Sequence, residues 1–233
     1  MPGTDGKVGL VFVSHSPKIA EGLVDLASQM APATSLAAAG GTDEGGIGTS
    51  FDKVSAAIGE VDSGVGVVVL ADLGSAILTA ETALDFLDDD VQARVRIVDA
   101  PLVEGAVAAS VTAETGGSLA EVVAAAETAR GASGAVPGPD AAAAPADDDA
   151  LRRTVTIVNK DGLHARPAAE FVKLANTFPS KVLINGKDSK SLLGIMSLGL
   201  IRGTTATLTT DDQEGKPALD SLAALIESGF GEA

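Results

Sequence analysis

The sequence predicts an α/β protein built of two units, a parallel-sheet unit followed by a smaller α+β unit. In residues 1–129 the strand candidates are nearly continuous apolar runs followed by helix patterns, which is typical of a parallel sheet covered on both faces. In residues 151–233 the strand candidates alternate apolar and polar residues, which is typical of an antiparallel sheet with helices on one face. Between the units, residues 130–150 consist mainly of Ala, Gly, Pro and Asp, so we expect a flexible linker there.

The first unit alternates strand and helix patterns along the chain. GVGVVVLAD, at residues 64–72, is its strongest strand candidate because the apolar run is unbroken. The segment that begins at Pro17 places Ile19, Leu23 and Leu26 on one side of a helix. In order, we expect strands at 7–14, 34–40, 64–72 and 94–101, and helices at 17–30, 51–60, 75–87 and 118–130.

The second unit has the predicted order βαββαβα. Its central hairpin, KVLINGKDSK, contains an Asn-Gly pair, which is the strongest short signal for a two-residue turn. We expect a strand at 151–159, a helix at 165–178, the hairpin at 181–190, a helical turn within 191–200, a strand at 204–210 and a helix at 215–229.

Composition excludes several classes of function. The chain has no cysteine, so it has no disulfides, thiolate metal sites or thiol nucleophile, and it suits a reducing compartment. Residues 1–150 hold 23 acidic and 6 basic side chains, a net charge of −17, which argues against a nucleic-acid partner. Residues 151–233 hold 9 and 10, a net charge of +1. The N-terminus lacks a signal-peptide pattern and no apolar run is long enough to span a bilayer, so we expect a cytoplasmic protein without a membrane partner.

Nucleotide and metal motifs are missing from the sequence. It contains no GxxxxGK[ST] loop, no glycine-rich kinase loop followed by a lysine, and no zinc-type spacing of His and Cys. We therefore predict no bound cofactor and no metal. If a phosphoryl group moves through this chain, it comes from another phosphoprotein or from phosphoenolpyruvate. The glycine-rich segment GGTDEGGIGTS is interpreted as a loop near the site.

The first of only two histidines, His15, follows the first predicted strand, at the edge where open α/β sheets bind ligands. Ser16 is placed to cap the next helix, whose free amides favour an anion. Asp72 ends the strongest strand and reaches the same edge, so we expect it to orient one ring nitrogen while the other attacks phosphorus. Gly74 and Ser75 begin another helix, and together with Ser16 they are candidates to bind phosphoryl oxygens. The alternatives are a histidine that only packs or caps, and ordinary turn chemistry at Gly74 and Ser75.

The second histidine, His164, also stands at a predicted helix start. Pro167 suits the first turn of that helix, and Arg166 can form a charge-assisted fork with phosphoryl oxygens. From the spacing alone, a phosphoryl-carrying role and a simple helix start remain equally open.

The second unit resembles a known family through GLHARPAAEFVKLA and SKSLLGIMSLGLIRG. Across residues 151–233 it resembles the phosphocarrier HPr of the phosphoenolpyruvate-dependent phosphotransferase system, although its hairpin is shorter than usual. The resemblance implies the HPr open-faced sandwich, with His164 phosphorylated at Nδ1 by enzyme I and Arg166 assisting. It also implies that Ser191 is a regulatory phosphorylation site, and that an apolar docking patch is formed by Leu192, Leu193 and Met196.

The first unit resembles a second family through FVSHSPKIAEG, AAGGTDEGGIGT, LADLGSAILTAETALDFL and DAPLVEGAVAASVTAETG. Over about residues 7–130 these segments resemble the IIA-type domain of the phosphotransfer subunit of phosphoenolpyruvate-dependent dihydroxyacetone kinase, which shares its fold with mannose-type IIA domains. The resemblance implies that His15 is phosphorylated at Nε2, that Asp72 bonds its ring, and that the unit forms a homodimer.

Together the two resemblances imply a phosphoryl relay and identify the chain as a phosphotransferase subunit. Enzyme I, expected as a separate protein, takes the group from phosphoenolpyruvate and passes it to His164. From there it moves to His15, and then to ADP held by a kinase subunit, while another subunit presents dihydroxyacetone to give dihydroxyacetone phosphate. Opposite net charges on the two units favour their encounter. The alternatives are a mannose-type IIA/HPr component for sugar uptake and a regulatory phosphocarrier that acts through Ser191.

Overall fold

The computed structural model describes residues 6–132 and 151–231, and the chain divides into two compact units, Met1–Gly131 and Ala132–Ala233. Each unit is described below by itself. Most of the predicted linker, residues 133–150, lies outside the described residues.

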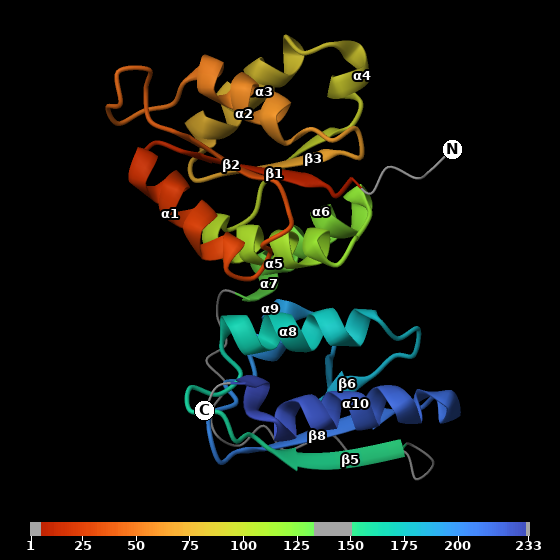
Figure 1. The fold of residues 1–233 in the computed structure, drawn as a ribbon. Coiled ribbons are helices and arrows are strands. Elements are labelled where there is room, and N and C mark those ends of the chain that lie inside the picture. Colours follow the sequence, from red (N-terminus) through yellow and green to blue (C-terminus); the bar gives the residue numbers. More distant parts are fainter. Residues whose placement is uncertain (1–5, 133–150, 232–233) are drawn as a thin grey trace. The chain divides into compact units, whose positions relative to one another are not determined.

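The first unit is built on a parallel sheet of four strands in the order β2-β1-β3-β4 (Figure 1). Every residue of the two central strands is buried, because helices cover both faces of the sheet. This burial on both faces explains the uninterrupted apolar runs in the sequence. The predicted fold class is confirmed. The strands are β1 (Gly9–Ser14), β2 (Leu36–Gly40), β3 (Val67–Ala71) and β4 (Val95–Val98).

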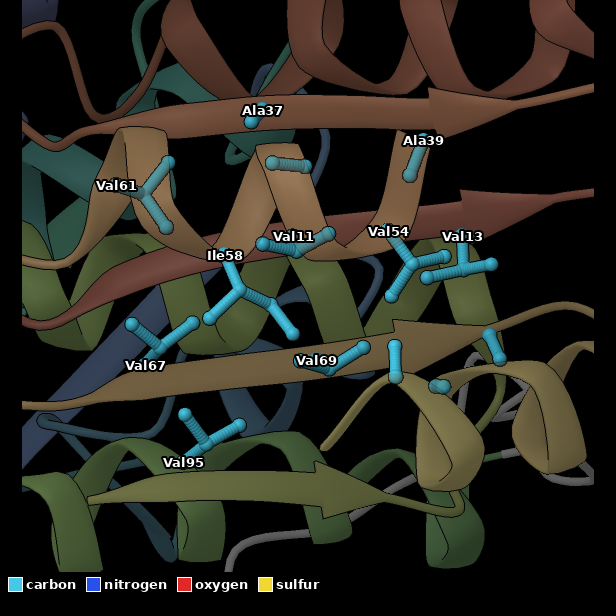
Figure 2. Close-up of a cluster of buried hydrophobic side chains, with 14 of the residues drawn as sticks. Val11, Val13, Ala37, Ala39, Val54, Ile58, Val61, Val67, Val69 and Val95 are labelled. Atoms are coloured by element: carbon cyan, nitrogen blue, oxygen red, sulfur yellow. The ribbon is translucent and has the colours of Figure 1, made fainter. Parts of the chain in front are cut away.

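Alternate residues of the central strands enter two separate cores. Val11 and Val13 of β1 point toward the face that α2 covers, where they meet Val54 and Ile58 (Figure 2). Leu10 and Phe12 enter the opposite core, with residues of α1, α5 and α6. One face carries α1 (Pro17–Ser28), α5 (Leu102–Glu114) and α6 (Leu119–Glu127), and the other carries α2 (Phe51–Val61), α3 (Gly74–Asp85) and α4 (Asp89–Gln92) (Figure 1). A short helix, α7 (Ala129–Ala132), follows α6.

The helices of the first unit differ from the sequence prediction at α4, at α5 and at the end of the unit. The sequence patterns predict no helix at residues 102–114, where the structure has α5, and none at α4. In α5 the residues 105–111 are all buried. The helix therefore carries small, mostly apolar side chains on nearly all sides, and its sequence shows no division into an apolar and a polar face. The single helix expected at 118–130 is divided into α6 and α7.

The second unit is an antiparallel sheet in the order β5-β8-β6-β7, with α8 and α10 against one face (Figure 1). Its elements follow the predicted order βαββαβα. At the hairpin turn Asn185 and Gly186 both have positive φ, 46° and 80°, as a tight turn between two-residue strands requires. The elements are β5 (Leu151–Thr156), α8 (Ala165–Asn176), β6 (Leu183–Ile184), β7 (Lys187–Asp188), α9 (Leu192–Met196), β8 (Thr205–Thr210) and α10 (Lys216–Glu227), with 3₁₀ turns at Gln213–Gly215 and Gly229–Gly231.

The core of the second unit lies between its helices and its sheet. α10 packs against β5, β8 and α8, and Phe171, Leu208 and Leu222 are fully buried. Of the helices within the described ranges, none has the length and apolar character needed to cross a membrane.

Two glycines of the first unit give a matched test of its packing. Gly9 begins β1, and a Cβ there would lie 2.3 Å from the carbonyl oxygen of Val61 and 2.7 Å from its Cβ. Gly59 is exposed on α2, and a Cβ there would meet nothing within 4 Å. We expect Gly9→Ala to lower the free energy of unfolding by about 1–3 kcal/mol through overpacking. We expect Gly59→Ala to raise it by about 0.5–1 kcal/mol through helix propensity. Urea denaturation followed by circular dichroism measures both, and equal effects of the two changes would contradict this packing.

Candidate functional site

The register of the parallel sheet brings the ends of β1 and β3 together. Val13 lies opposite Ala71, so the residues that follow, Ser14 and His15 on one side and Asp72 on the other, emerge at the same carboxyl edge. The main-chain N–H of Asp72 continues the ladder by donating to the carbonyl oxygen of Val13 at 3.1 Å. A site at this edge is therefore assembled from residues 57 positions apart.

Asp72 accepts three hydrogen bonds at this edge. Its Oδ1 lies 2.9 Å from Nδ1 of His15. Its Oδ2 accepts from the Ser14 hydroxyl at 2.8 Å and from the main-chain N–H of His15 at 2.9 Å. Because an ionised carboxylate can only accept, the ring proton of a neutral His15 sits on Nδ1, and the lone pair is on Nε2.

The charge of Asp72 follows from the same contacts. Burial raises the pKa of the Asp72 carboxyl, but the hydrogen bonds from the main chain and ring of His15 and from Ser14 outweigh this effect and hold the pKa below its ordinary value of 3.8. The carboxylate is therefore ionised at neutral pH and can stabilise positive charge that develops on the imidazole. The His15 side chain retains 22% of its exposure, so its ring can be reached from solvent.

Ser75 occupies the other side of the His15 ring. Its Oγ lies 2.8 Å from Nε2, and with the lone pair on Nε2 the hydroxyl is the donor. Ser75 follows Gly74 in the first turn of α3, where main-chain amides have no acceptor within the helix. The structure thus brings His15, Asp72 and Ser75 together, with Gly74 next to Ser75 in the chain, and the Ser75 hydroxyl is the donor beside Nε2.

The Ser16 side chain does not cap α1 as the sequence predicts. Ser16 is the N-cap residue of α1, but its side chain makes no capping bond. Its main-chain N–H donates to Oγ of Ser14 at 3.1 Å.

The glycine-rich segment 40–50 lies against the main chain at His15. Gly41 donates to the carbonyl oxygen of Ser14 at 3.0 Å, and Gly48 donates to that of His15 at 2.9 Å. Gly41 has φ of 73°, and a Cβ there would lie 2.5 Å from Cγ of Pro17, so this close approach requires glycine. The segment supports the histidine through main-chain bonds.

The sequence analysis missed Ser14. Its side chain is fully buried and bonds both Asp72 and Ser16. The available signal was its chemistry, because it is the only polar side chain in the strand GLVFVS.

The second histidine stands at a simpler site. His164 is exposed and is the N-cap residue of α8, without a side-chain capping bond. Its main-chain N–H donates to Gly162 at 2.9 Å, and its carbonyl accepts from Ala168 at 2.9 Å. Gly162 has φ of 72°, and a Cβ there would lie 2.3 Å from the carbonyl oxygen of Leu200, so the turn before His164 is tightly packed.

Arg166 is exposed in the first turn of α8. Its Nε lies 3.7 Å from Oε1 of Glu170, one turn further along the helix. This exposed ion pair is weak, so the guanidinium can exchange the carboxylate for phosphoryl oxygens.

The remaining predicted residues lie on or next to α9. The Ser191 hydroxyl caps this helix by accepting from the N–H of Gly194 at 3.2 Å. Leu192, Leu193 and Met196 all belong to α9, and their docking role stays a prediction, as does phosphorylation of Ser191.

In residues 6–132 and 151–231, no group of three or more His, Asp or Glu side chains is close enough to hold a metal ion.

Comparison with known proteins gives a match for each unit. The family model for the PTS system fructose IIA component matches residues 9–123. The family model for the PTS HPr component phosphorylation site matches residues 151–228.

Three relatives show how the units are combined elsewhere. The phosphoryl donor subunit DhaM of the PEP-dependent dihydroxyacetone kinase of Escherichia coli (strain K12) is 39% identical over 241 residues, which are 97% of this chain and 51% of that protein. DhaM of PEP-dependent dihydroxyacetone kinase 2 from Listeria innocua is 41% identical over 105 residues, 45% of this chain and 84% of that protein. The phosphocarrier protein HPr of Cupriavidus necator is 46% identical over 86 residues, 35% of this chain and 97% of that protein. The chain thus spans about half the length of the E. coli relative.

The contacts of Asp72 predict how stability depends on pH. Because the folded-state pKa lies below 3.8, the carboxylate stabilises the fold above that pH, and this stabilisation is lost as the pH falls through the folded pKa. At neutral pH we expect Asp72→Asn to lower the free energy of unfolding by about 1–3 kcal/mol. The gap to the wild type should narrow as the pH falls below 3.8.

Chemical denaturation across a pH series measures this gap. Asp85→Asn, at an exposed position near the end of α3, is the matched control and should change stability little at any pH. If the difference in free energy of unfolding between Asp72→Asn and the wild type did not vary with pH, the lowered pKa of Asp72 would be contradicted.

Proposed function

The chain belongs to the family of DhaM phosphoryl donor subunits of dihydroxyacetone kinases, and on this premise we propose that it relays phosphoryl groups from His164 to His15 and then to a kinase subunit. The observation that carries the proposal is the bond between Asp72 and Nδ1 of His15. It leaves the Nε2 lone pair beside Ser75 in the first turn of α3 and gives the ring a counter-charge.

At His15 the reaction is a displacement at phosphorus. The Nε2 lone pair attacks the phosphoryl group, and the P–N bond to the donor imidazole breaks as the new P–N bond forms. The ionised Asp72 stabilises the positive charge that develops on the ring. Ser75, which bonds Nε2 at rest, must release the lone pair, and its hydroxyl can then donate to a phosphoryl oxygen.

At His164 we propose that Nδ1 carries the group. The ring is exposed at the start of α8, where first-turn amides favour an anion, and Arg166 stands two residues away. An exposed carrier suits a residue that meets more than one partner. The order of transfer from His164 to His15 rests on the family.

Upstream and downstream steps are also proposals. We propose that enzyme I loads His164 from phosphoenolpyruvate. In the next steps His15 phosphorylates ADP held on a kinase subunit, and dihydroxyacetone is the final acceptor. A homodimer through the first unit is proposed on the same family basis. Sugar uptake is the weaker reading, because the DhaM relatives match both units in the same order along nearly the whole chain.

Labelling from phosphoenolpyruvate tests the relay. With enzyme I present, we expect the full chain to gain acid-labile phosphate on both histidines. His164→Ala should abolish labelling of both sites, because His15 would lose its donor. His15→Ala should keep label on His164, and dihydroxyacetone phosphate formation with the kinase subunits should fall to background. Label on His15 in the His164→Ala protein would contradict the proposed order.

A further inference from the structure

Ser14 is a buried hydroxyl in a strand whose other side chains are apolar. It ends β1, and its side chain has no exposed area. A hydroxyl removed from water destabilises the fold unless it is hydrogen-bonded, so an alanine or valine would suit this core position better on packing alone. A serine at this position is therefore explained by the hydrogen bonds that its hydroxyl makes.

The contacts of Ser14 join the two sides of the site. Its hydroxyl donates to Oδ2 of Asp72 at 2.8 Å, and the same oxygen accepts from the main-chain N–H of Ser16 at 3.1 Å. Oδ2 of Asp72 accepts otherwise from the main-chain N–H of His15. With Oδ1 bonded to the His15 ring, donors hold both carboxylate oxygens.

We propose that Ser14 is a positioning residue for phosphoryl transfer at His15. By holding Oδ2, its hydroxyl fixes the plane of the Asp72 carboxylate so that Oδ1 faces Nδ1 of His15 and keeps the ring proton there. The lone pair then stays on Nε2, the atom that the proposed function needs as the nucleophile. Without Ser14, Oδ2 would keep one donor and the carboxylate would have more freedom to turn away from the ring.

The competing role is purely structural. Ser14 also gives Ser16 an acceptor where β1 meets α1, so its loss destabilises the fold under either view. A structural role alone would change the free energy of unfolding and leave the His15 tautomer as it is. The tautomer of the folded protein therefore distinguishes the two roles, and it can be read without any phosphoryl donor.

The test is ¹⁵N NMR of the full chain labelled in histidine, at an alkaline pH where imidazole is neutral. In the wild type we expect His15 to show a protonated Nδ1 and an unprotonated Nε2. In Ser14→Ala we expect its signals to move toward the tautomer mixture of a free imidazole, with those of His164 unchanged. The matched control is Ser110→Ala, because Ser110 is equally buried in the same unit and its hydroxyl has no hydrogen-bond partner in the described structure.

A kinetic measurement adds the link to the proposed function. Transfer to His15 should slow roughly tenfold in Ser14→Ala, the size expected for one hydrogen bond to a charged group. Ser14→Thr keeps the hydroxyl and should retain the wild-type tautomer, whereas Ser14→Cys, a weak donor of similar size, should follow Ser14→Ala if the latter does not fold.

Each outcome of these measurements either supports or overturns the role proposed for Ser14. An unchanged His15 tautomer in folded Ser14→Ala or Ser14→Cys overturns the inference, and so does an equal shift in Ser110→Ala. A shifted tautomer in a protein that never accepts phosphate supports the role of Ser14 in fixing the ring while refuting the proposed function.

Discussion

The bond between Asp72 and Nδ1 of His15 is the interaction on which the rest of the site depends. It settles which ring nitrogen carries the proton, and so which one has the lone pair. Under the proposed function it also places a negative charge beside a ring that becomes positive when it is phosphorylated. The contacts of Ser14 and of the His15 main chain serve this bond, because they hold the carboxylate in place and keep it ionised.

The parallel sheet makes this arrangement possible. β1 and β3 are buried on both faces, so polar side chains have no place in the strands until the strands end. At that edge α3 begins, and the Ser75 hydroxyl in its first turn lies 2.8 Å from Nε2 of His15.

The two histidine sites differ in how they are assembled. His164 depends on one tight turn and one helix start, and its ring is exposed. His15 draws on the ends of two strands, the start of α3 and a glycine-rich loop, and its ring is held on both nitrogens. A locally built, exposed carrier can meet several partners, whereas a site assembled from distant segments fixes the direction of attack. This contrast suits the proposed relay, in which His164 is loaded and His15 delivers.

The sequence by itself determined the strands, most of the helices and the position of both histidines before a helix, because these features depend on neighbouring residues. Apolar runs mark buried strands, and serine, proline or histidine before a periodic segment marks a helix start. It did not reveal α5, which is buried nearly all round and so has no polar face. It placed Asp72 at the right edge of the sheet, but not the contacts of the carboxylate with Ser14 or of Ser75 with Nε2. Those pairs are 58 and 60 residues apart. Only strand register and side-chain rotamers bring such groups to within hydrogen-bond distance, and both are decided by packing across the whole unit.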